Sequence, residues 1–130
     1  MPHFTIEYSA NLDEHVDFDR LCRTIHKTIL DTGLFEIGAV RVRTVRSIHY
    51  AIADRMPENG FIDMSFRIGR GRSDAEKQAT GKAILDAVTQ ELAGLFDTPH
   101  FALSLEIREI DPDLSWKKNA IHPRLRQKGN

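Results

Sequence analysis

Several features are scarce in this chain of 130 residues, and each scarcity excludes a class of protein. Cys22 is the only cysteine, so no disulfide can form within the chain, which fits a reducing compartment. No apolar run is long enough to span a membrane, and residues 1–11 lack the basic and apolar regions of a signal peptide. We therefore expect a soluble cytoplasmic protein.

An excess of charge of one sign is also missing. The chain has 18 basic and 19 acidic residues, with a formal net charge of −1, so neither nucleic acid nor an anionic membrane is needed as a partner. The basic clusters Lys117–Lys118 and Arg124–Lys128 have no interleaved aromatic residue apart from Trp116, which argues against nucleic-acid binding. The six histidines show no metal-ligand spacing, so no metal site is expected.

What is present is ordinary globular composition, with 41% hydrophobic and 28% charged residues. This length fits a single domain over residues 1–130. Changes in hydrophobic period divide it into a first strand-helix-strand unit at 2–56, a second at 57–112 and a tail at 113–130.

The first unit starts with alternating polar and apolar residues over 2–8, which predicts a strand. A helix is expected from about Asp17, its N-cap, to Gly33, in the position of a C-terminal capping glycine. Its buried face comprises Phe18, Leu21, Ile25 and Ile29. A second strand is expected around Val40–Arg43, and residues 45–53 either continue it or form a short extra strand.

The second unit follows a turn at residues 57–60. Clean alternation over 62–68 predicts a third strand, and alternation over 101–110 predicts a fourth. Between them, Ser73 and Glu76 have the spacing of a capping box that opens a long helix. The residues expected to be buried along that helix are Ile84, Leu85, Val88, Leu92 and Leu95.

The fold class expected from this order is α+β, with two right-handed βαβ units forming a four-stranded sheet and two helices on one face. The tail has few apolar residues, so it is interpreted as solvated or as wrapping another subunit, and no third helix is expected. Other subunits would then cover the opposite face of the sheet, which predicts an oligomer without fixing its symmetry.

Pro2 is the first candidate for chemistry. Initiator methionine is removed before small residues such as proline, and its loss would expose a secondary amine at the start of a strand. An α-amino group titrates near ~8 in peptides, and burial or neighbouring arginines would lower its pKa further, as a general base at neutral pH requires. The alternative is an ordinary N-terminus, since a Met-Pro start alone is a weak signal.

Four arginines form the second candidate group. Arg41 and Arg43 share one face of the second strand, and Arg70 and Arg72 flank Gly71 where the third strand meets a helix N-terminus. Guanidinium groups bind carboxylates through paired hydrogen bonds, so an anionic, carboxylate-bearing ligand is indicated. Each arginine alone could instead be a surface charge or pair with acidic residues across subunits.

Three segments carry a resemblance to a known family: residues 1–9, the junction at 68–73 and the stretch at 105–112, together with Trp116-Lys-x-Asn119. They resemble the 5-carboxymethyl-2-hydroxymuconate Δ-isomerases of the tautomerase superfamily, which includes 4-oxalocrotonate tautomerase and macrophage migration inhibitory factor. The similarity extends from Pro2 to about His122. It implies two βαβ units per subunit, a homotrimer, and neither a metal nor an organic cofactor.

The resemblance also implies a reaction, in which Pro2 moves a proton across a conjugated 2-hydroxy-dienoic acid to give the 2-oxo-enoic acid. Arg72 matches the carboxylate-binding arginine of the family and Arg41 a second arginine that contacts substrate, while the family's substrate has three carboxylates. Two alternatives stay open. One is another proline-based enzyme, such as a hydratase, dehalogenase or decarboxylase, with Glu7, Glu106 or Glu109 activating water. The other is a non-catalytic trimeric binding protein that retains Met1.

Overall fold

The structure is a computed structural model that describes residues 1–128. These residues form four strands and three helices, with short 3-10 turns between them. In chain order the elements are β1 (His3–Ser9), α1 (Phe18–Asp31), β2 (Arg41–Ser47), β3 (Gly60–Gly69), α2 (Asp74–Glu91), β4 (Phe101–Ile110) and α3 (Ile121–Lys128).

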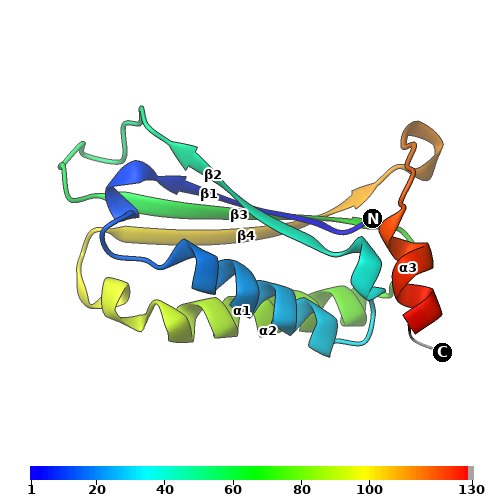
Figure 1. The fold of residues 1–130 in the computed structure, drawn as a ribbon. Coiled ribbons are helices and arrows are strands. Elements are labelled where there is room, and N and C mark those ends of the chain that lie inside the picture. The colour runs from blue at the N-terminus through cyan, green and yellow to red at the C-terminus, as the bar shows by residue number, and fades with distance from the viewer. Residues whose placement is uncertain (129–130) are drawn as a thin grey trace.

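The strands form one mixed sheet in the order β2-β1-β3-β4. The outer strands β2 and β4 run parallel to their neighbours β1 and β3, whereas the two central strands are antiparallel to each other. Helices α1 and α2 lie side by side beneath one face of the sheet (Figure 1). The prediction of two βαβ units with two helices on one face is confirmed.

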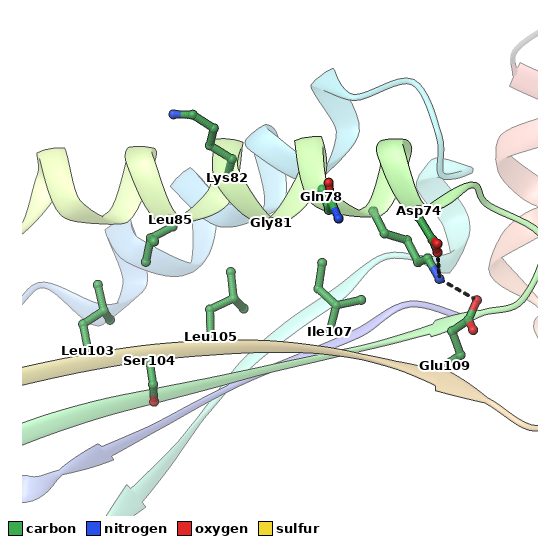
Figure 2. A pocket seen from close by; sticks show the side chains of 11 residues that line it. Asp74, Gln78, Gly81, Lys82, Leu85, Leu103, Ser104, Leu105, Ile107 and Glu109 are labelled. Carbon is green, nitrogen blue, oxygen red and sulfur yellow. Dashed lines mark ion pairs between the residues drawn. The ribbon is translucent and has the colours of Figure 1, made fainter.

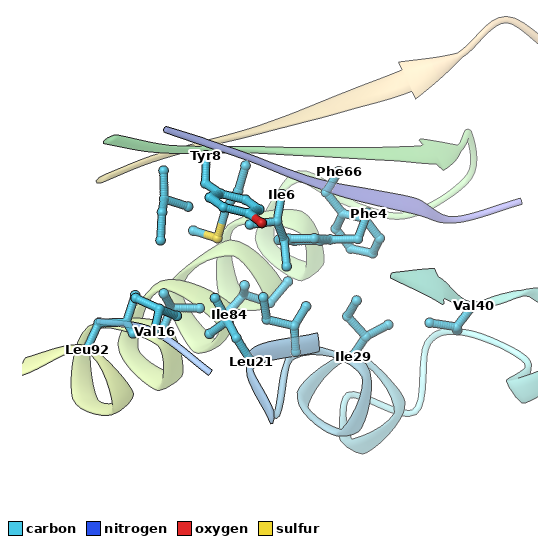
Figure 3. Close-up of a cluster of buried hydrophobic side chains, with 14 of the residues drawn as sticks. Phe4, Ile6, Tyr8, Val16, Leu21, Ile29, Val40, Phe66, Ile84 and Leu92 are labelled. Atoms are coloured by element: carbon cyan, nitrogen blue, oxygen red, sulfur yellow. The ribbon is translucent and has the colours of Figure 1, made fainter. Parts of the chain in front are cut away.

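The hydrophobic core lies between this face and the two helices (Figure 3). Alternate residues of the central strands point inward, so Phe4, Ile6 and Phe66 are fully buried. Residues three and four apart meet them from the helices, with Leu21, Ile25, Ile29, Ile84 and Val88 fully buried. The rings of Phe4 and Phe66 pack with their centroids 5.3 Å apart.

The helix ends follow the local signals. The side chain of Asp17 accepts a hydrogen bond from the backbone N–H of Arg20 at 3.0 Å, which caps α1. Gly33 ends that helix with φ of 72°, a conformation that costs glycine little. Ser73 and Glu76 exchange both hydrogen bonds of a capping box at the start of α2. These three predictions are confirmed.

One core prediction is wrong. Leu85 was expected in the buried stripe of the long helix, but its side chain is 39% exposed. The reason is that α2 lies beneath the edge of the sheet, so Leu85 faces only the outermost strand, β4 (Figure 2). The sequence left open whether residues 45–53 continue the second strand or form an extra one. In the structure β2 continues to Ser47, and residues 48–59 form a loop.

The tail differs most from expectation, because it contains the third helix, α3. This helix packs against the 3-10 turn Ile37–Ala39, beside the start of β1 (Figure 1), and does not cover the sheet. The uncovered face carries mainly polar side chains, among them Thr5, Glu7 and Asp63. A polar face can meet water, so its burial is not required by the fold.

None of the helices within residues 1–128 is both long and apolar enough to cross a membrane.

Candidate active site

The sheet topology gathers four chain segments at one end of the molecule. Because β1 and β3 are antiparallel, the start of β1 at His3 pairs with Arg67 near the end of β3. Parallel pairing places Arg41, at the start of β2, beside His3. The end of β4 at Ile110 pairs with Gly69, so the tail also leaves the sheet at this end. The sequence candidates therefore converge although they lie far apart in the chain.

Pro2 is buried at this end and lines a cavity of about 470 Å³. Its carbonyl oxygen accepts a hydrogen bond from the backbone N–H of Arg41 at 3.3 Å, which ties the residue to the start of β2. The walls comprise Met1, Phe35, Glu36, Ala39, Gly69, Arg70, Arg72, Lys117, Asn119, His122, Pro123 and Arg126. Cationic side chains outnumber the single carboxylate among the lining residues that the structure describes. The cavity therefore favours an anionic ligand.

Arg72 lies in the same cavity, and its guanidinium group is held in one orientation. Nη2 donates to the carbonyl oxygen of Leu34 at 2.9 Å, and Nη1 donates to that of Gly69 at 3.3 Å. The guanidinium carbon lies 4.1 Å from the centre of the Phe35 ring, a cation–π contact. Among the described residues, buried Nε has no hydrogen-bond partner. The structure thus brings two of the candidates, Pro2 and Arg72, to one site.

Arg41 is close to this site but is not part of the cavity wall. Its Nη1 lies 3.5 Å from the sulfur of Met1 and 3.4 Å from the carbonyl oxygen of Ala39. Arg43 lies on the uncovered face, with Nη1 3.3 Å from Nδ1 of His3. Arg41 therefore adds positive charge beside the terminal residue without lining the cavity, and Arg43 adds positive charge on the uncovered face.

The cations have a direct effect on the terminal amine. With Met1 in place, burial lowers the pKa of its α-amino group, and the charges of Lys117, Arg72 and Arg41 lower it further. Burial and the neighbouring Arg67 likewise lower the pKa of His3. An amine at this end of the sheet is therefore biased toward its neutral, basic form.

Part of the cavity wall comes from the tail, which the sequence predicts to be solvated or to wrap another subunit. Nδ2 of Asn119 donates to the carbonyl oxygen of Gly38 at 2.9 Å, and its Oδ1 accepts the first backbone N–H groups of α3. Arg126 binds both carboxylate oxygens of Glu36, at 2.6 and 2.7 Å, and lowers the pKa of that carboxyl group. Nδ1 of His122 lies 3.2 Å from the same carboxylate, without the angle of a hydrogen bond.

A larger groove, of about 690 Å³, lies between α2 and β4 (Figure 2). Leu85, Leu103, Leu105 and Ile107 make it largely apolar, and Lys77 closes one end through ion pairs with Asp74 at 3.2 Å and Glu109 at 3.4 Å. Its charged groups are already in ion pairs, since Lys82, which also lines it, lies 2.7 Å from Asp86. We therefore assign the site to the smaller cavity, where Pro2 lies beside unpaired cations. No cluster of residues suited to a metal ion occurs within the described part of the chain.

Comparison with known proteins decides the family. A family model of 5-carboxymethyl-2-hydroxymuconate isomerase matches residues 2–125. The chain belongs to this isomerase family. The predicted resemblance and the predicted class of enzyme, an isomerase, are therefore confirmed.

Individual members of the isomerase family agree over nearly their whole length. A 5-carboxymethyl-2-hydroxymuconate Delta-isomerase from Escherichia coli is 32% identical over 122 residues, which are 94% of this chain and 97% of that protein. The crystal structure of a 5-carboxymethyl-2-hydroxymuconate isomerase from Deinococcus radiodurans R1 is 36% identical, with a TM-score of 0.89 over 95% of this chain and 93% of its own. A fused 4-OT structure, 14% identical with a TM-score of 0.68 over 89% of this chain and 93% of its own, shares the tautomerase fold.

The similarity also indicates what could have identified the missed residues. The segment Trp116-Lys-x-Asn119 is part of the resemblance, and it contains Lys117 and Asn119 of the cavity wall. Glu36 and Gly38 carried no such signal, because their role depends on contacts with the tail, and Phe35 carried none, because its role depends on Arg72 lying over its ring.

Proposed function

We propose that this isomerase acts on 5-carboxymethyl-2-hydroxymuconate or a closely related 2-hydroxy-dienoic acid, with Pro2 as general base once Met1 has been removed. The observation that carries the proposal is the position of Pro2, which is buried at the start of β1 in the same cavity as Arg72. The relatives named for this substrate, at 32% and 36% identity, support the choice of substrate.

The proposed reaction is a proton transfer within the substrate. The neutral amine of Pro2 accepts the proton of the 2-hydroxyl group, and the electrons of the O–H bond form the C2=O bond. The electron pair of the C2=C3 bond forms the C3=C4 bond. The electron pair of the C4=C5 bond forms a new C5–H bond with the proton that the Pro2 ammonium gives up. The product is a conjugated 2-oxo-enoic acid, and the amine is regenerated. The first step needs a neutral amine. Burial and the surrounding positive charge favour that form, because they lower the pKa of the terminal amine.

Arg72 is proposed to bind a substrate carboxylate, since its orientation is fixed by two backbone carbonyl groups and its charge faces the cavity of Pro2. Arg41 is proposed as the second arginine, beside the terminal amine. Because it lies outside the wall of the described cavity, we propose that its charge attracts an anion toward the site.

The alternative proline-based reactions are less favoured by the site. They need a carboxylate to activate water near Pro2, and the acidic residue that lines the described cavity, Glu36, is held by Arg126. Of the residues suggested for that role, Glu109 pairs with Lys77 in the separate groove, and Glu106 lies 3.7 Å from Arg108. Isomerisation needs no such group.

We also propose that the protein is a cytoplasmic homotrimer. Support for association comes from the apolar groove beside the edge strand β4 and from two exposed residues of the tail, Leu114 and Trp116, which are 72% and 84% exposed. The number of subunits rests on the family resemblance. Light scattering after gel filtration would measure it, and a monomer would contradict the proposal.

The function is tested by intact-mass analysis and activity together. The processed protein should lack one methionine and convert the dienol to the ketone, followed by loss of the dienol absorbance. Pro2→Ala should lower kcat by about 10² to 10⁴-fold, the usual contribution of a general base, with an unchanged circular dichroism spectrum. Full activity in a protein that retains Met1, in which the nitrogen of Pro2 is an amide, would show that the amine of Pro2 is not the base. Full activity in Pro2→Ala, which keeps a primary amine, would show that the proline ring is not required.

A further inference from the structure

The tail of the chain contributes a cation to the site that the function proposed above does not use. Lys117 lines the cavity together with Pro2 and Arg72, whereas the adjacent Lys118 does not. Within residues 1–128 no carboxylate lies within ion-pair distance of Lys117. Its ammonium group is therefore a free charge at the wall of a cavity that favours anions.

Lys117 is held near this position by the residues that follow it. Asn119, two residues further on, is bonded on one side to the carbonyl oxygen of Gly38 and on the other to the first N–H groups of α3. The paired hydrogen bonds between Arg126 and Glu36 anchor the far turn of the same helix. Lys117 is exposed, and its backbone lies two residues from the anchored Asn119, so its side chain remains free to reach into the cavity that it lines.

The other cations of the wall differ in how many of their hydrogen-bond donors already have partners in the protein. Arg126 is neutralised by Glu36, and Arg72 gives two donors to backbone carbonyl groups. Arg70, like Lys117, has no ion-pair partner among residues 1–128. A ligand with one carboxylate on Arg72 would leave Lys117 unpaired in the same cavity. A ligand with two carboxylates separated by a short carbon chain would satisfy both charges.

We propose that Lys117 is a specificity-determining residue that binds a second carboxylate of the substrate and so selects di- and tricarboxylates over monocarboxylates. This inference rests on the proposed function for the identity of the reaction, but not for the binding itself. The lowered pKa of the terminal amine, to which the charge of Lys117 contributes after burial, is consistent with an ammonium group facing the N-terminus.

Binding of an unreactive probe tests the inference without any chemistry. Adipate carries two carboxylates and hexanoate one, and calorimetry measures the affinity of each. Lys117→Met should weaken adipate binding by on the order of tenfold, the size expected for a lost hydrogen bond between charged groups, and leave hexanoate binding within about twofold. Lys117→Arg should restore adipate binding, and Lys118→Met, the matched control, should bind both acids like the wild type.

Kinetics then separates this inference from the proposed function. With the tricarboxylate dienol, at a pH above the acid limb of the profile, Lys117→Met should raise KM while kcat changes little, because the charge binds a remote carboxylate. Equal adipate affinity in Lys117→Met and the wild type, or a wild type that binds adipate no better than hexanoate, would overturn the inference even if the enzyme is active. If the wild type isomerises no dienol but Lys117→Met still loses adipate binding, the inference about Lys117 is upheld while the proposed reaction fails.

Discussion

Replacing Gly38 by alanine tests how closely α3 packs against the turn Ile37–Ala39. A Cβ atom at this position would lie 2.7 Å from Nδ1 of His122 and 3.3 Å from its Cα and backbone N. Ordinary contact begins at 3.4 Å, so the ring must move by about 0.7 Å. Rotation of the ring cannot relieve the two backbone contacts, and α3 itself must shift.

The expected magnitude follows from that shift. Inserting a methyl group into a packed contact costs about 1–3 kcal/mol. The same movement strains the 2.9 Å hydrogen bond from Asn119 to the carbonyl oxygen of Gly38, which contributes about 1 kcal/mol. We expect Gly38→Ala to lower the free energy of unfolding by about 1–3 kcal/mol and to raise KM, because the tail wall of the cavity moves away from Pro2.

The assay is urea denaturation together with steady-state kinetics. Gly94→Ala is the matched control, since a Cβ there meets no atom within 4 Å and neither glycine has a positive φ. Its unfolding free energy should stay within about 0.5 kcal/mol of the wild type. If Gly38→Ala unfolds and turns over like Gly94→Ala, the close packing of α3 on Gly38 is not a feature of the molecule in solution.

Three further predictions concern the amine, the core and a helix cap. With Met1 in place, burial and then the charge of Lys117 lower the pKa of the α-amino group. We expect the same surroundings to act on the Pro2 amine, so the acid limb of the kcat/KM profile should lie below the ordinary amine pKa of ~8, and Lys117→Met should move this limb to higher pH; an unmoved limb would contradict the assignment. Ile25→Ala, at a fully buried site, should cost about 2–5 kcal/mol in urea denaturation, whereas Ile48→Ala, at a site 64% exposed, should cost under about 0.5; equal costs would contradict the core. Ser73→Ala removes the oxygen that accepts the N–H of Glu76 and should cost about 1 kcal/mol, with Ser73→Thr as the retained cap; no loss in the alanine variant would exclude the capping box.

Most of the sheet and both long helices could be predicted from the sequence, because burial on one face imposes a regular period. The alternation over residues 62–68 lies within β3, and the spacing that begins at Phe18 gives the buried face of α1. Leu85 shows the limit of this reasoning. Its spacing matches a buried position, but only the placement of α2 under the edge of the sheet determines how much of it is covered.

The site was only partly predictable. Pro2 and Arg72 were found from their chemistry and from the family resemblance, and antiparallel pairing of β1 and β3 explains why they meet. The sequence did not predict the part of the wall formed by α3. Polar contacts, such as that of Glu36 with Arg126, anchor this helix, and it has no apolar stripe to reveal it. Contacts between polar residues 90 positions apart leave no period in the sequence.

The antiparallel centre of the sheet has a consequence for how this architecture could be re-engineered. The two βαβ halves are arranged head to tail, so β3 begins at the end of the molecule opposite to the start of β1, next to Tyr8 and Ser9. A circular permutant opened before Gly60 would carry its free amine there, far from Arg72. The duplicated plan thus offers two strand starts, and the point at which the chain is opened selects which end of the sheet can become reactive.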